Sequence, residues 1–473
     1  MKRFGITIMF IFSAVSYTGA QDTLWTGHYG LIDTTELGYC GDITSDGGFI
    51  VGGESSKFLN GDMWLVRCDA NGDTLWTRNY GAARWQMAYS VIQTSDEGFI
   101  ACGEYSVAVG DYDMYVVRVD PAGDTLWTRL FGTVDQNDYG REIIQTSDGG
   151  FLALGQGYGT SGSSDLYMAK IDESGNLTWS KTYGYSGGSE YGYGAVQLPD
   201  DGYAIAGSYA YLSTSDLWLL RTDSNGDTLW TERFDFHGDV DRGDDIEIAD
   251  DGGFVIAGRT KNAGNMRLLT MKTDSLGNML WWREYGSSSS DFAESIDKTS
   301  DGGFVICGGA NAYPFDFFVV RISAIGDSLW AGIYDYDGIP GDSDDSFEVR
   351  VHPNGDIMVF GYADVKTGTG ADNDFWVVKI HDGALQQPGC EYAVGDANNS
   401  GSLNGLDVTY GVAFFKGGPM PPYECECTPG NTWFVAGDVN ASCSYNGLDI
   451  TYLVNYFKGG SDVEPCADCP PAG

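Results

Sequence analysis

Most of the chain is built from repeats of one unit. A tryptophan inside a short strand-like phrase, "DTLW" in several copies, returns every 49 to 52 residues. The tryptophans are Trp25, Trp76, Trp127, Trp179, Trp230, Trp281 and Trp330. One unit of this length cannot bury its own apolar face, so equivalent units have to pack against one another. This repetition constrains the fold more than any other feature of the sequence.

Each unit contains four runs with the composition of β-strands, as in "YSVIQT", "GFIACGEY", "MYVVRVD" and "DTLWTR". Two junctions are short. "TSDGG" joins the first pair of runs and "DANGD" or "DPAGD" joins the last pair, and Asp, Asn and Gly favour tight hairpin turns. Seven such units predict an all-β fold, a seven-bladed β-propeller over residues 21–382.

The first and last units are incomplete in complementary ways. The phrase "DTLWTGHYG" begins at Asp22 without the three runs that precede it elsewhere. The last unit, from about Ser343 to Asp382, has three runs and lacks this phrase. We therefore expect the N-terminal phrase to form the fourth strand of the last blade. This pairing would close the ring and remove two exposed sheet edges.

The combined phrase "VVRVDPAGDTLWTR" resembles the tryptophan-docking repeats of pyrroloquinoline-quinone-like and delta-60-like propellers. The resemblance covers Asp22 to Asp382 and implies the propeller fold. Quinoprotein dehydrogenases have eight blades, and a vicinal cysteine pair with a catalytic Asp beside calcium. This chain has seven units and no adjacent cysteines, so their redox chemistry is not expected.

The charge of the chain limits its partners. The formal net charge is −41, and it becomes −43 without residues 1–20, which hold two basic and no acidic side chains. Such a surface repels a phosphate backbone, so nucleic acid is not an expected partner. Calcium is a natural counter-ion for so many carboxylates.

The N-terminus indicates export. Residues 1–20 have a basic start, an apolar run and small residues before Gln21, as in a secretory signal peptide. No other apolar run is long enough to span a membrane. The ten cysteines suit an oxidising compartment. We expect a secreted or cell-surface protein.

The face that carries the variable loops is the expected binding face. The connections after each "DTLW" phrase, here called crossing loops, and those between the second and third strands differ among copies and emerge on the same face. Aromatic side chains with acidic neighbours suit sugar rings or protein side chains; the alternative is that these rings only pack the loops. The crossing-loop aromatics and one histidine are Trp85, Phe131, Tyr139, Tyr185, Tyr191, Phe236, His237, Tyr285, Tyr334 and Tyr336.

One position holds acidic residues in six of the seven copies. It lies thirteen residues before the aromatic of "DGGF", just before the expected innermost strand. Its residues are Glu36, Gln86, Asp138, Glu190, Asp241, Asp291 and Asp344. These carboxylates would form a ring near the mouth of the channel. Each would cap its own loop, or together they would share a cation.

Two loops near the C-terminus have the spacing of calcium sites. Both read D-x-N-x-S-x-x-x-N-x-x-D and precede a short apolar run. This spacing places oxygen ligands at positions 1, 3, 5, 9 and 12 of an EF-hand-like loop. The expected ligands are Asp396, Asn398, Ser400, Asn404 and Asp407 in the first loop and Asp438, Asn440, Ser442, Asn446 and Asp449 in the second.

This C-terminal region, residues 395–473 after a linker at 383–394, resembles a type I dockerin. The resemblance implies a small helical domain with two Ca²⁺ ions that binds a cohesin-like partner through Gly405, Leu406, Gly447 and Leu448. Ser400 and Ser442 at position 5 remove charge and should weaken calcium binding, and Cys443 replaces a glycine. The basic pair expected on the helix is missing and an insert separates the two copies, so calcium binding is favoured over cohesin binding. Its cysteines are Cys390, Cys425, Cys427, Cys443, Cys466 and Cys469. They would form disulfides, with a zinc site as the alternative.

The sequence contains no persuasive catalytic motif. The four histidines lack a metal-ligand spacing, and "GYSGG" and "GYGTSG" lie in propeller loops. We expect an exported, non-catalytic binding or scaffold protein. Its propeller would bind a glycan or a protein, and its tail a cell-surface or cohesin-like partner. The alternative is a dockerin-bearing hydrolase or lyase that degrades polysaccharides.

Overall fold

The computed structural model describes residues 23–382 except loop segments at 32–33, 57–60, 82–83, 109–110, 133–136, 159–162, 186, 287–289, 311–314, 337–343 and 366–372. In the rest of the chain it describes residues 425–428, 431–433, 447–458 and three single positions. The chain divides into two compact units, residues 1–382 and 383–473. The expected signal peptide lies outside the described residues.

The first unit is a seven-bladed β-propeller, as the repeats predict. Within its described residues, strands β1 to β28 form seven four-stranded antiparallel sheets, each a blade. Blade 1 comprises β2 (Glu36–Ile43), β3 (Phe49–Ser55), β4 (Asp62–Cys68) and β5 (Thr74–Tyr80). Blade 2 comprises β6 (Gln86–Gln93), β7 (Phe99–Ala108), β8 (Asp111–Val119) and β9 (Thr125–Phe131). Blade 3 comprises β10 (Tyr139–Gln145), β11 (Phe151–Tyr158), β12 (Ser164–Ile171) and β13 (Leu177–Tyr183).

The next three blades repeat this order. Blade 4 comprises β14 (Ser189–Gln197), β15 (Tyr203–Tyr211), β16 (Thr214–Thr222) and β17 (Thr228–Phe234). Blade 5 comprises β18 (Asp241–Ile248), β19 (Phe254–Asn262), β20 (Asn265–Thr273) and β21 (Met279–Tyr285). Blade 6 comprises β22 (Phe292–Lys298), β23 (Phe304–Ala310), β24 (Asp316–Ile322) and β25 (Ser328–Tyr334).

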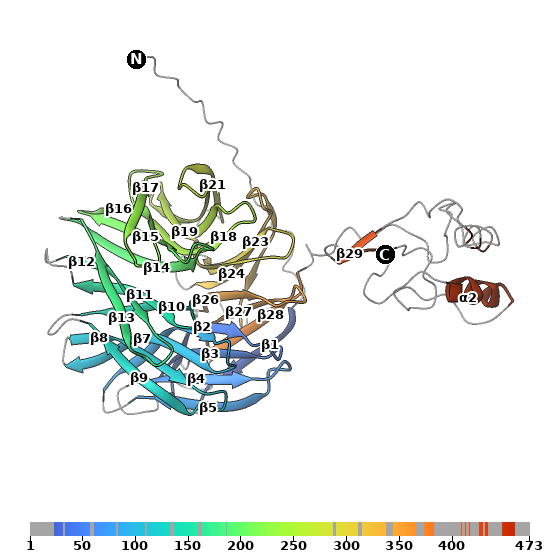
Figure 1. The fold of residues 1–473 in the computed structure, drawn as a ribbon, viewed down its shortest axis with the longest axis horizontal. Coiled ribbons are helices and arrows are strands. Elements are labelled where there is room, and N and C mark those ends of the chain that lie inside the picture. The colour runs from blue at the N-terminus through green and yellow to red at the C-terminus, as the bar shows by residue number, and fades with distance from the viewer. Residues whose placement is uncertain are drawn as a thin grey trace, which may run out of the picture. The chain divides into compact units, whose positions relative to one another are not determined.

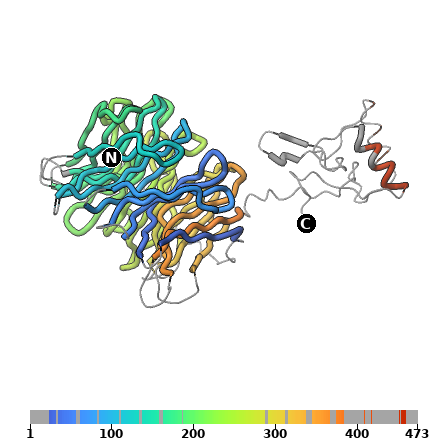
Figure 2. Tube along the Cα trace, turned by 90° about the horizontal axis from the view of Figure 1, so that it is seen from below, coloured from blue at the N-terminus to red at the C-terminus, as the bar shows by residue number. Residues whose placement is uncertain are grey.

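Blade 7 joins the two ends of the propeller. It contains β26 (Asp345–Val351), β27 (Ile357–Asp364) and β28 (Asn373–Ile380), and its outermost strand is β1 (Thr23–Tyr29). β1 pairs with β28 in antiparallel register, with Thr26 opposite Val378. Figure 2 shows this dark-blue strand beside the orange strands of the last blade. The expectation that the N-terminal phrase closes the ring is confirmed.

The first strand of each blade is the innermost. β2, β6, β10, β14, β18, β22 and β26 contact one another around the centre, whereas the fourth strands lie at the periphery (Figure 1). Apolar side chains fill the seams between blades. Between blades 1 and 2, for example, Ile50 and Leu65 pack with Val91 and Ala101. This burial is the main stabilising contribution to the contacts between blades.

The repeated tryptophan fastens each blade to the next. The Trp127 ring packs on Phe151, and its Nε1–H donates to the Glu173 carbonyl at 3.1 Å. The turn residue Gly175 has φ +83°, and a Cβ there would lie 2.8 Å from Trp127. Glycine is therefore required both by the turn and by the tryptophan. The edge-to-face aromatic contact and the hydrogen bond together explain why the phrase recurs.

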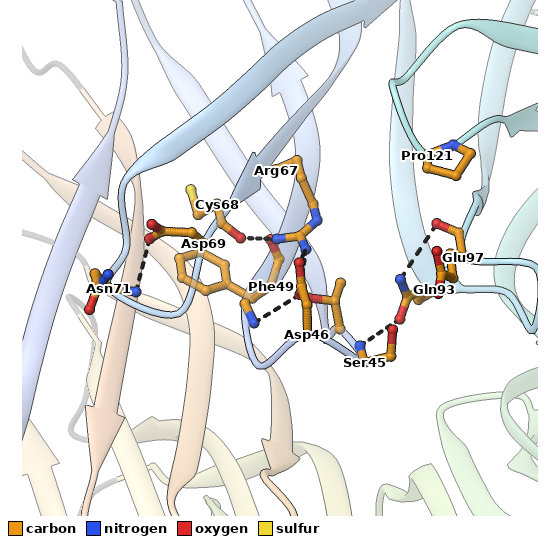
Figure 3. A network of polar contacts seen from close by, with 12 residues as sticks. Ser45, Asp46, Phe49, Arg67, Cys68, Asp69, Asn71, Gln93, Glu97 and Pro121 are labelled. Carbon is orange, nitrogen blue, oxygen red and sulfur yellow. Dashed lines mark hydrogen bonds and ion pairs between the residues drawn. The ribbon is translucent and has the colours of Figure 1, made fainter.

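Every blade contains an internal ion pair that was not predicted from the sequence. In blade 1 the Arg67 guanidinium lies inside the sheet, donates to the Cys68 carbonyl and reaches Asp46 at 2.6 Å (Figure 3). Equivalent pairs occupy the other blades. They are Arg118–Asp96, Lys170–Asp148, Arg221–Asp200, Lys272–Asp251, Arg321–Asp301 and Lys379–Asp356. In six blades the Asp that opens the "DGG" turn thus neutralises a cation buried in the third strand, and in blade 7 Asp356, directly before β27, takes this role.

The second unit is described only in part. Its described elements are β29 (Cys425–Thr428), β30 (Asn431–Trp433) and the helix α2 (Gly447–Phe457). β29 pairs with β30 in antiparallel fashion. No described helix has both the length and the apolar character needed to cross a membrane. The four cysteines of the propeller, Cys40, Cys68, Cys102 and Cys307, are buried and free.

Candidate functional site

The innermost strand of every blade contains a β-bulge at the same place. In β10, Gly140 pairs with Gly155 and Glu142 pairs with the next residue, Leu154, so Arg141 has no partner on β11. The same shift occurs in all seven innermost strands of the described propeller. The seven extra residues, here called the bulge residues, are Tyr39, Tyr89, Arg141, Tyr193, Asp244, Glu294 and Phe347. Bulges often redirect side chains beside functional sites.

All seven bulge residues line one cavity in the central channel. The cavity has a volume of about 330 Å³ and is bounded by the innermost strand of every blade. This volume lies at the lower end of the range for small-ligand pockets, roughly 300–1,000 Å³. The fold therefore brings one chemically different side chain from each blade to a common site.

One side of the cavity is aromatic. The ring of Tyr39 on blade 1 lies 5.5 Å from Tyr89 on blade 2 and 5.2 Å from Phe347 on blade 7, measured between ring centroids. The Phe347 ring stacks on Tyr362 at 5.8 Å. Burial raises the pKa of Tyr39 far above its ordinary value, so its hydroxyl stays protonated. This aromatic arc spans blades 7, 1 and 2.

Blades 5 and 6 contribute a carboxylate–guanidinium cluster. Asp244 accepts a hydrogen bond from Nε of Arg242 at 2.5 Å and one from Nε of Arg259 at 3.1 Å. Arg259 also donates to Glu294 at 2.6 Å. The Arg242 guanidinium lies 3.9 Å from the centroid of the Tyr193 ring. The two arginines hold the bulge carboxylates Asp244 and Glu294 in fixed positions.

Deeper in the channel, one arginine is surrounded by several acids. Arg350 Nη1 lies 2.6 Å from Glu348 Oε1, and Arg350 Nε lies 3.7 Å from Asp42 Oδ1. Burial raises the pKa of Asp42 to about 6, that of Glu348 to about 7 and that of Glu247 to about 8. Arg350 opposes the rise at all three. One guanidinium cannot neutralise so many carboxylates, so protons balance part of the charge.

Glu142 is the lining carboxylate with spare hydrogen-bonding capacity. It accepts a hydrogen bond from the Ala195 N–H, while its Oε2 is buried without a hydrogen-bond partner. Burial raises the pKa of Glu142 well above its usual range, and the charges of Asp245 and Glu348 raise it further. Arg350 lowers it. Burial and these acidic neighbours therefore favour the protonated form of Glu142.

Several polar residues beside the bulges have a structural task. Each follows a bulge residue and accepts a hydrogen bond from a backbone N–H of the next blade's innermost strand. Ser90 accepts from Ile143 at 3.3 Å and Asp245 from Ile296 at 2.9 Å. These contacts satisfy strand edges that would otherwise face the channel without partners. The bulge residues themselves do not perform this task, which leaves them to determine the chemistry of the cavity.

The expected ring of acids has a different location from the cavity. The described residues of this set, Glu36, Gln86, Asp138, Glu190, Asp241, Asp291 and Asp344, are buried, and the cavity lining includes none of them. Four bind the backbone of the crossing loop before them, with donors Leu31, Tyr185, Phe236 and Tyr336 at 2.7–3.1 Å. Asp291 Oδ2 lies 4.0 Å from Arg267 Nη1.

The crossing-loop aromatics make contacts with their neighbours. Trp85 Nε1 donates to Glu54 at 2.5 Å, and the Phe236 ring lies 4.9 Å from Trp282. His237 Nε2 lies 2.5 Å from Glu284. Tyr185 is partly exposed and lies 3.0 Å from the Thr231 hydroxyl. These four side chains contact neighbours outside the cavity lining. The aromatic side chains of the cavity come from the innermost strands.

The expected calcium ligands and the cysteines of the tail lie outside the residues whose side chains the structure describes. Asp449, Gly447 and Leu448 fall within α2, and only their backbone is described. Gly405, Leu406 and Asp407 fall just before Val408, a described helical position. Among the described residues, no group of three or more His, Cys, Asp or Glu side chains is arranged to hold a metal ion.

The bulge residues could have been found in the sequence. They lie ten residues before the "DGGF" aromatic, and a glycine or alanine precedes most of them. Their chemistry varies from copy to copy, from Tyr39 to Arg141 and Asp244. The signal in the sequence was this variation within an otherwise regular strand. The acidic position predicted to form a ring lies three residues earlier.

Comparisons with known proteins add information on the fold alone. No family model matches the chain, and no relative is found among curated proteins. Similar solved structures include Sqt1 of Chaetomium thermophilum bound to the N-terminus of ribosomal protein L10, with 9% identity and a TM-score of 0.43, covering 76% of this chain and 100% of that one. The polysaccharide lyase Uly1 has 12% identity and a TM-score of 0.47, covering 71% and 88%. A protein of unknown function from Dyadobacter fermentans has 9% identity and a TM-score of 0.44, covering 76% and 98%.

Proposed function

We propose that this protein is an exported, non-catalytic glycan-binding protein. Its propeller would hold one sugar unit in the channel cavity, and its C-terminal module, loaded with two Ca²⁺ ions, would attach it to a cohesin-like or other cell-surface partner. The observation that supports the binding site most directly is the set of seven aligned bulges. They present aromatic rings on one side of a single cavity and carboxylates with arginines on the other.

The size and lining of the cavity favour a sugar over a protein surface. A stable protein interface buries roughly 800 Å² on each partner, usually across a broad patch. A cavity of about 330 Å³ instead suits one small unit. Tyr39, Tyr89 and Phe347 offer flat apolar faces to the C–H groups of a sugar ring, while Glu142 and Arg141 offer hydrogen bonds to its hydroxyls.

Binding of oligosaccharides to the full-length protein, measured by calorimetry after a glycan-array screen, tests this proposal. Tyr39→Ala removes the centre of the aromatic arc and should weaken binding by about tenfold or more. Tyr39→Phe keeps the ring and should bind like the wild type, which separates stacking from hydroxyl chemistry. No binding to any glycan, or equal affinity of Tyr39→Ala and wild type, would contradict the proposed site.

The tail proposal is supported by the identical spacing of the two ligand sets at Asp396 and Asp438 and by α2, which starts inside the second loop. Calorimetric titration of calcium into the full-length protein, after a chelator has removed its bound calcium, should show two calcium ions bound. Asp438→Ala should leave one. An envelope partner retained only with calcium would support attachment, and loss of binding in Asp438→Ala would assign it to this module. Retention unaffected by a chelator would contradict a calcium-dependent dock.

A second candidate function is polysaccharide cleavage. It is favoured by Glu142 and Glu348, two carboxyls of the same cavity whose pKa values burial raises, for Glu348 to about 7. A protonated carboxyl beside an ionised one is the arrangement that glycosidases use. Release of reducing ends or unsaturated products, lost in both Glu142→Gln and Glu348→Gln, would establish the enzyme. Binding without turnover would leave the first proposal in place.

A further inference from the structure

The carboxylates of the cavity outnumber its guanidiniums. Five acids and three arginines line it. The acids are Glu142, Asp244, Asp245, Glu294 and Glu348, and the arginines are Arg141, Arg242 and Arg350. Asp42, Glu247 and Asp297 add further acidic groups around Arg350. A ligand that brings a positive charge can therefore take the place of a proton held by these acids, whereas an acidic sugar would add to the charge that has to be neutralised.

Most of these acids already have fixed partners. Asp244 and Glu294 bind Arg259, and Glu348 binds Arg350. Asp245 accepts from the backbone of Ile296. Glu142 differs, because its buried Oε2 has no hydrogen-bond partner among the described residues. An unsatisfied buried oxygen costs roughly 1–3 kcal/mol, so a donor from a ligand would be strongly favoured there.

No neighbouring side chain supplies that donor. Arg141 precedes Glu142 in β10, but its guanidinium lies over the Tyr89 ring, 4.2 Å from the centroid. From β18 and β26, the acids Asp245 and Glu348 face Glu142, and Arg350 is the base among its strongest electrostatic neighbours. From β14 it receives only the Ala195 N–H, and from β7 the nearby ionisable group is the buried thiol of Cys102.

The aromatic arc completes a site for a cation. Tyr89 and Tyr193 each already carry an arginine over one ring face, which shows that these rings accept positive charge in this cavity. Tyr39 and Phe347 line the same cavity, and their rings lie against other aromatic rings. A ligand ammonium group can therefore contact a carboxylate and an aromatic face together.

We propose that the sugar unit held in the cavity is a hexosamine with a free, positively charged amino group, and that Glu142 recognises this group. The inference rests on the proposed glycan-binding function and specifies its ligand. The amino group donates to the Glu142 carboxylate, which turns its unpaired oxygen toward the ligand, and the sugar ring lies against the Tyr39 side of the cavity. An N-acetylated hexosamine lacks the charge and is bound no better than glucose.

The charge state of Glu142 gives a signature that a neutral sugar cannot produce. Burial and the neighbouring acids raise the pKa of Glu142, which favours its protonated form in the free protein. An ammonium group beside it favours the ionised form, so the carboxyl releases its proton when the ligand binds. The proton goes to the buffer and can be counted by calorimetry in buffers of different ionisation enthalpy.

The test compares three β-1,4-linked trisaccharides, of glucosamine, N-acetylglucosamine and glucose, on the full-length protein at pH 6.5. We expect the glucosamine trisaccharide to bind about tenfold tighter than the other two, with release of close to one proton. Glu142→Gln should reduce its affinity to that of the glucose trisaccharide and abolish proton release. The matched control Glu173→Gln changes an exposed turn and should leave both unchanged.

Each remaining outcome separates the inference from the function on which it rests. Equal affinity for the glucosamine and glucose trisaccharides would overturn the inference while supporting glycan binding. No affinity for any trisaccharide would overturn the proposed function itself. If methylamine bound as tightly as the glucosamine trisaccharide, the site would read an amine alone, as on a lysine side chain, and the sugar assignment would fail.

Discussion

Asp382 accepts hydrogen bonds from Arg321 Nε at 2.9 Å and from Trp330 Nε1 at 3.0 Å, and the paired Arg321 and Asp382 side chains are fully buried. Asp382 follows β28 of blade 7, whereas its two partners belong to blade 6. This buried pair therefore joins the end of the propeller to the preceding blade. In other blades the repeated tryptophan contacts a turn of the next blade, as Trp76 and Trp127 do.

Asp382→Asn should be strongly destabilising, because it removes the charge that faces a buried guanidinium. Breaking a buried pair typically costs about 3–5 kcal/mol. Asp301 still faces Arg321, so we expect a loss of about 3 kcal/mol in urea unfolding. Asp124→Asn is the control, because its pair with Arg78 is exposed on both sides and predicts a loss of less than about 1 kcal/mol. Equal losses in the two variants would contradict the role of Asp382.

Closure by β1 should be separable from the rest of the fold. Removing residues 1–30 leaves the edge of β28 unpaired, and we expect a lower melting temperature and concentration-dependent association. A synthetic peptide of residues 21–30 should restore the wild-type melting curve when added in trans. A scrambled peptide provides the control. A truncated protein as stable and monomeric as the wild type would show that β1 is dispensable.

Tyrosines that donate a hydrogen bond to a turn of the next blade, such as Tyr80, should each contribute measurable stability through the hydroxyl. Tyr80 is buried and donates to the Gly123 carbonyl of the next blade at 2.7 Å. Tyr80→Phe leaves this carbonyl without its partner and should cost about 1–2 kcal/mol in urea unfolding. Tyr211→Phe, at an exposed strand end, should change stability by less than about 0.5 kcal/mol. A neutral Tyr80→Phe variant would mean that water replaces the lost bond.

The stability of the propeller should fall as pH rises from about 5 to about 8. Burial, and then the charges of Asp297 and Asp245, raise the pKa of Glu247 to about 8. The folded state thus keeps a proton that the unfolded chain loses near pH 4.3, so the stabilisation present below that pH is lost as pH rises through the folded pKa.

Glu247→Gln mimics the protonated form and isolates this effect. It should match the wild type at pH 5 and exceed its free energy of unfolding by about 1–3 kcal/mol at pH 8, since water in the channel moderates the burial of this group. Glu173→Gln, in an exposed turn, should follow the wild type at both values. A difference that does not change with pH would rule out titration of Glu247 as the cause.

The sequence predicted the architecture because repeats reveal what every blade needs. Trp76 and its equivalents recur because each seam needs the same ring, and the orphan phrase at Asp22 pointed to the partner of β28. The cavity was not predicted, because a one-residue bulge at Arg141 depends on how two strands pair rather than on which residues they contain. The ion pair of Arg67 with Asp46 was missed for a related reason, since the charge sits inside an apolar run and pairs across a turn.

Each blade contributes one bulge residue to the cavity, while the rest of the blade keeps the regular packing of the repeat. A substitution at Tyr39 or Phe347 changes one side chain of the site without touching a seam tryptophan or a buried ion pair. The bulge residues of neighbouring blades differ because this position was free to diverge. The residues that pack the blades together were constrained. New specificities should therefore arise by single changes at the bulge positions outside the Asp244–Glu294–Arg259 cluster, without weakening the contacts between blades.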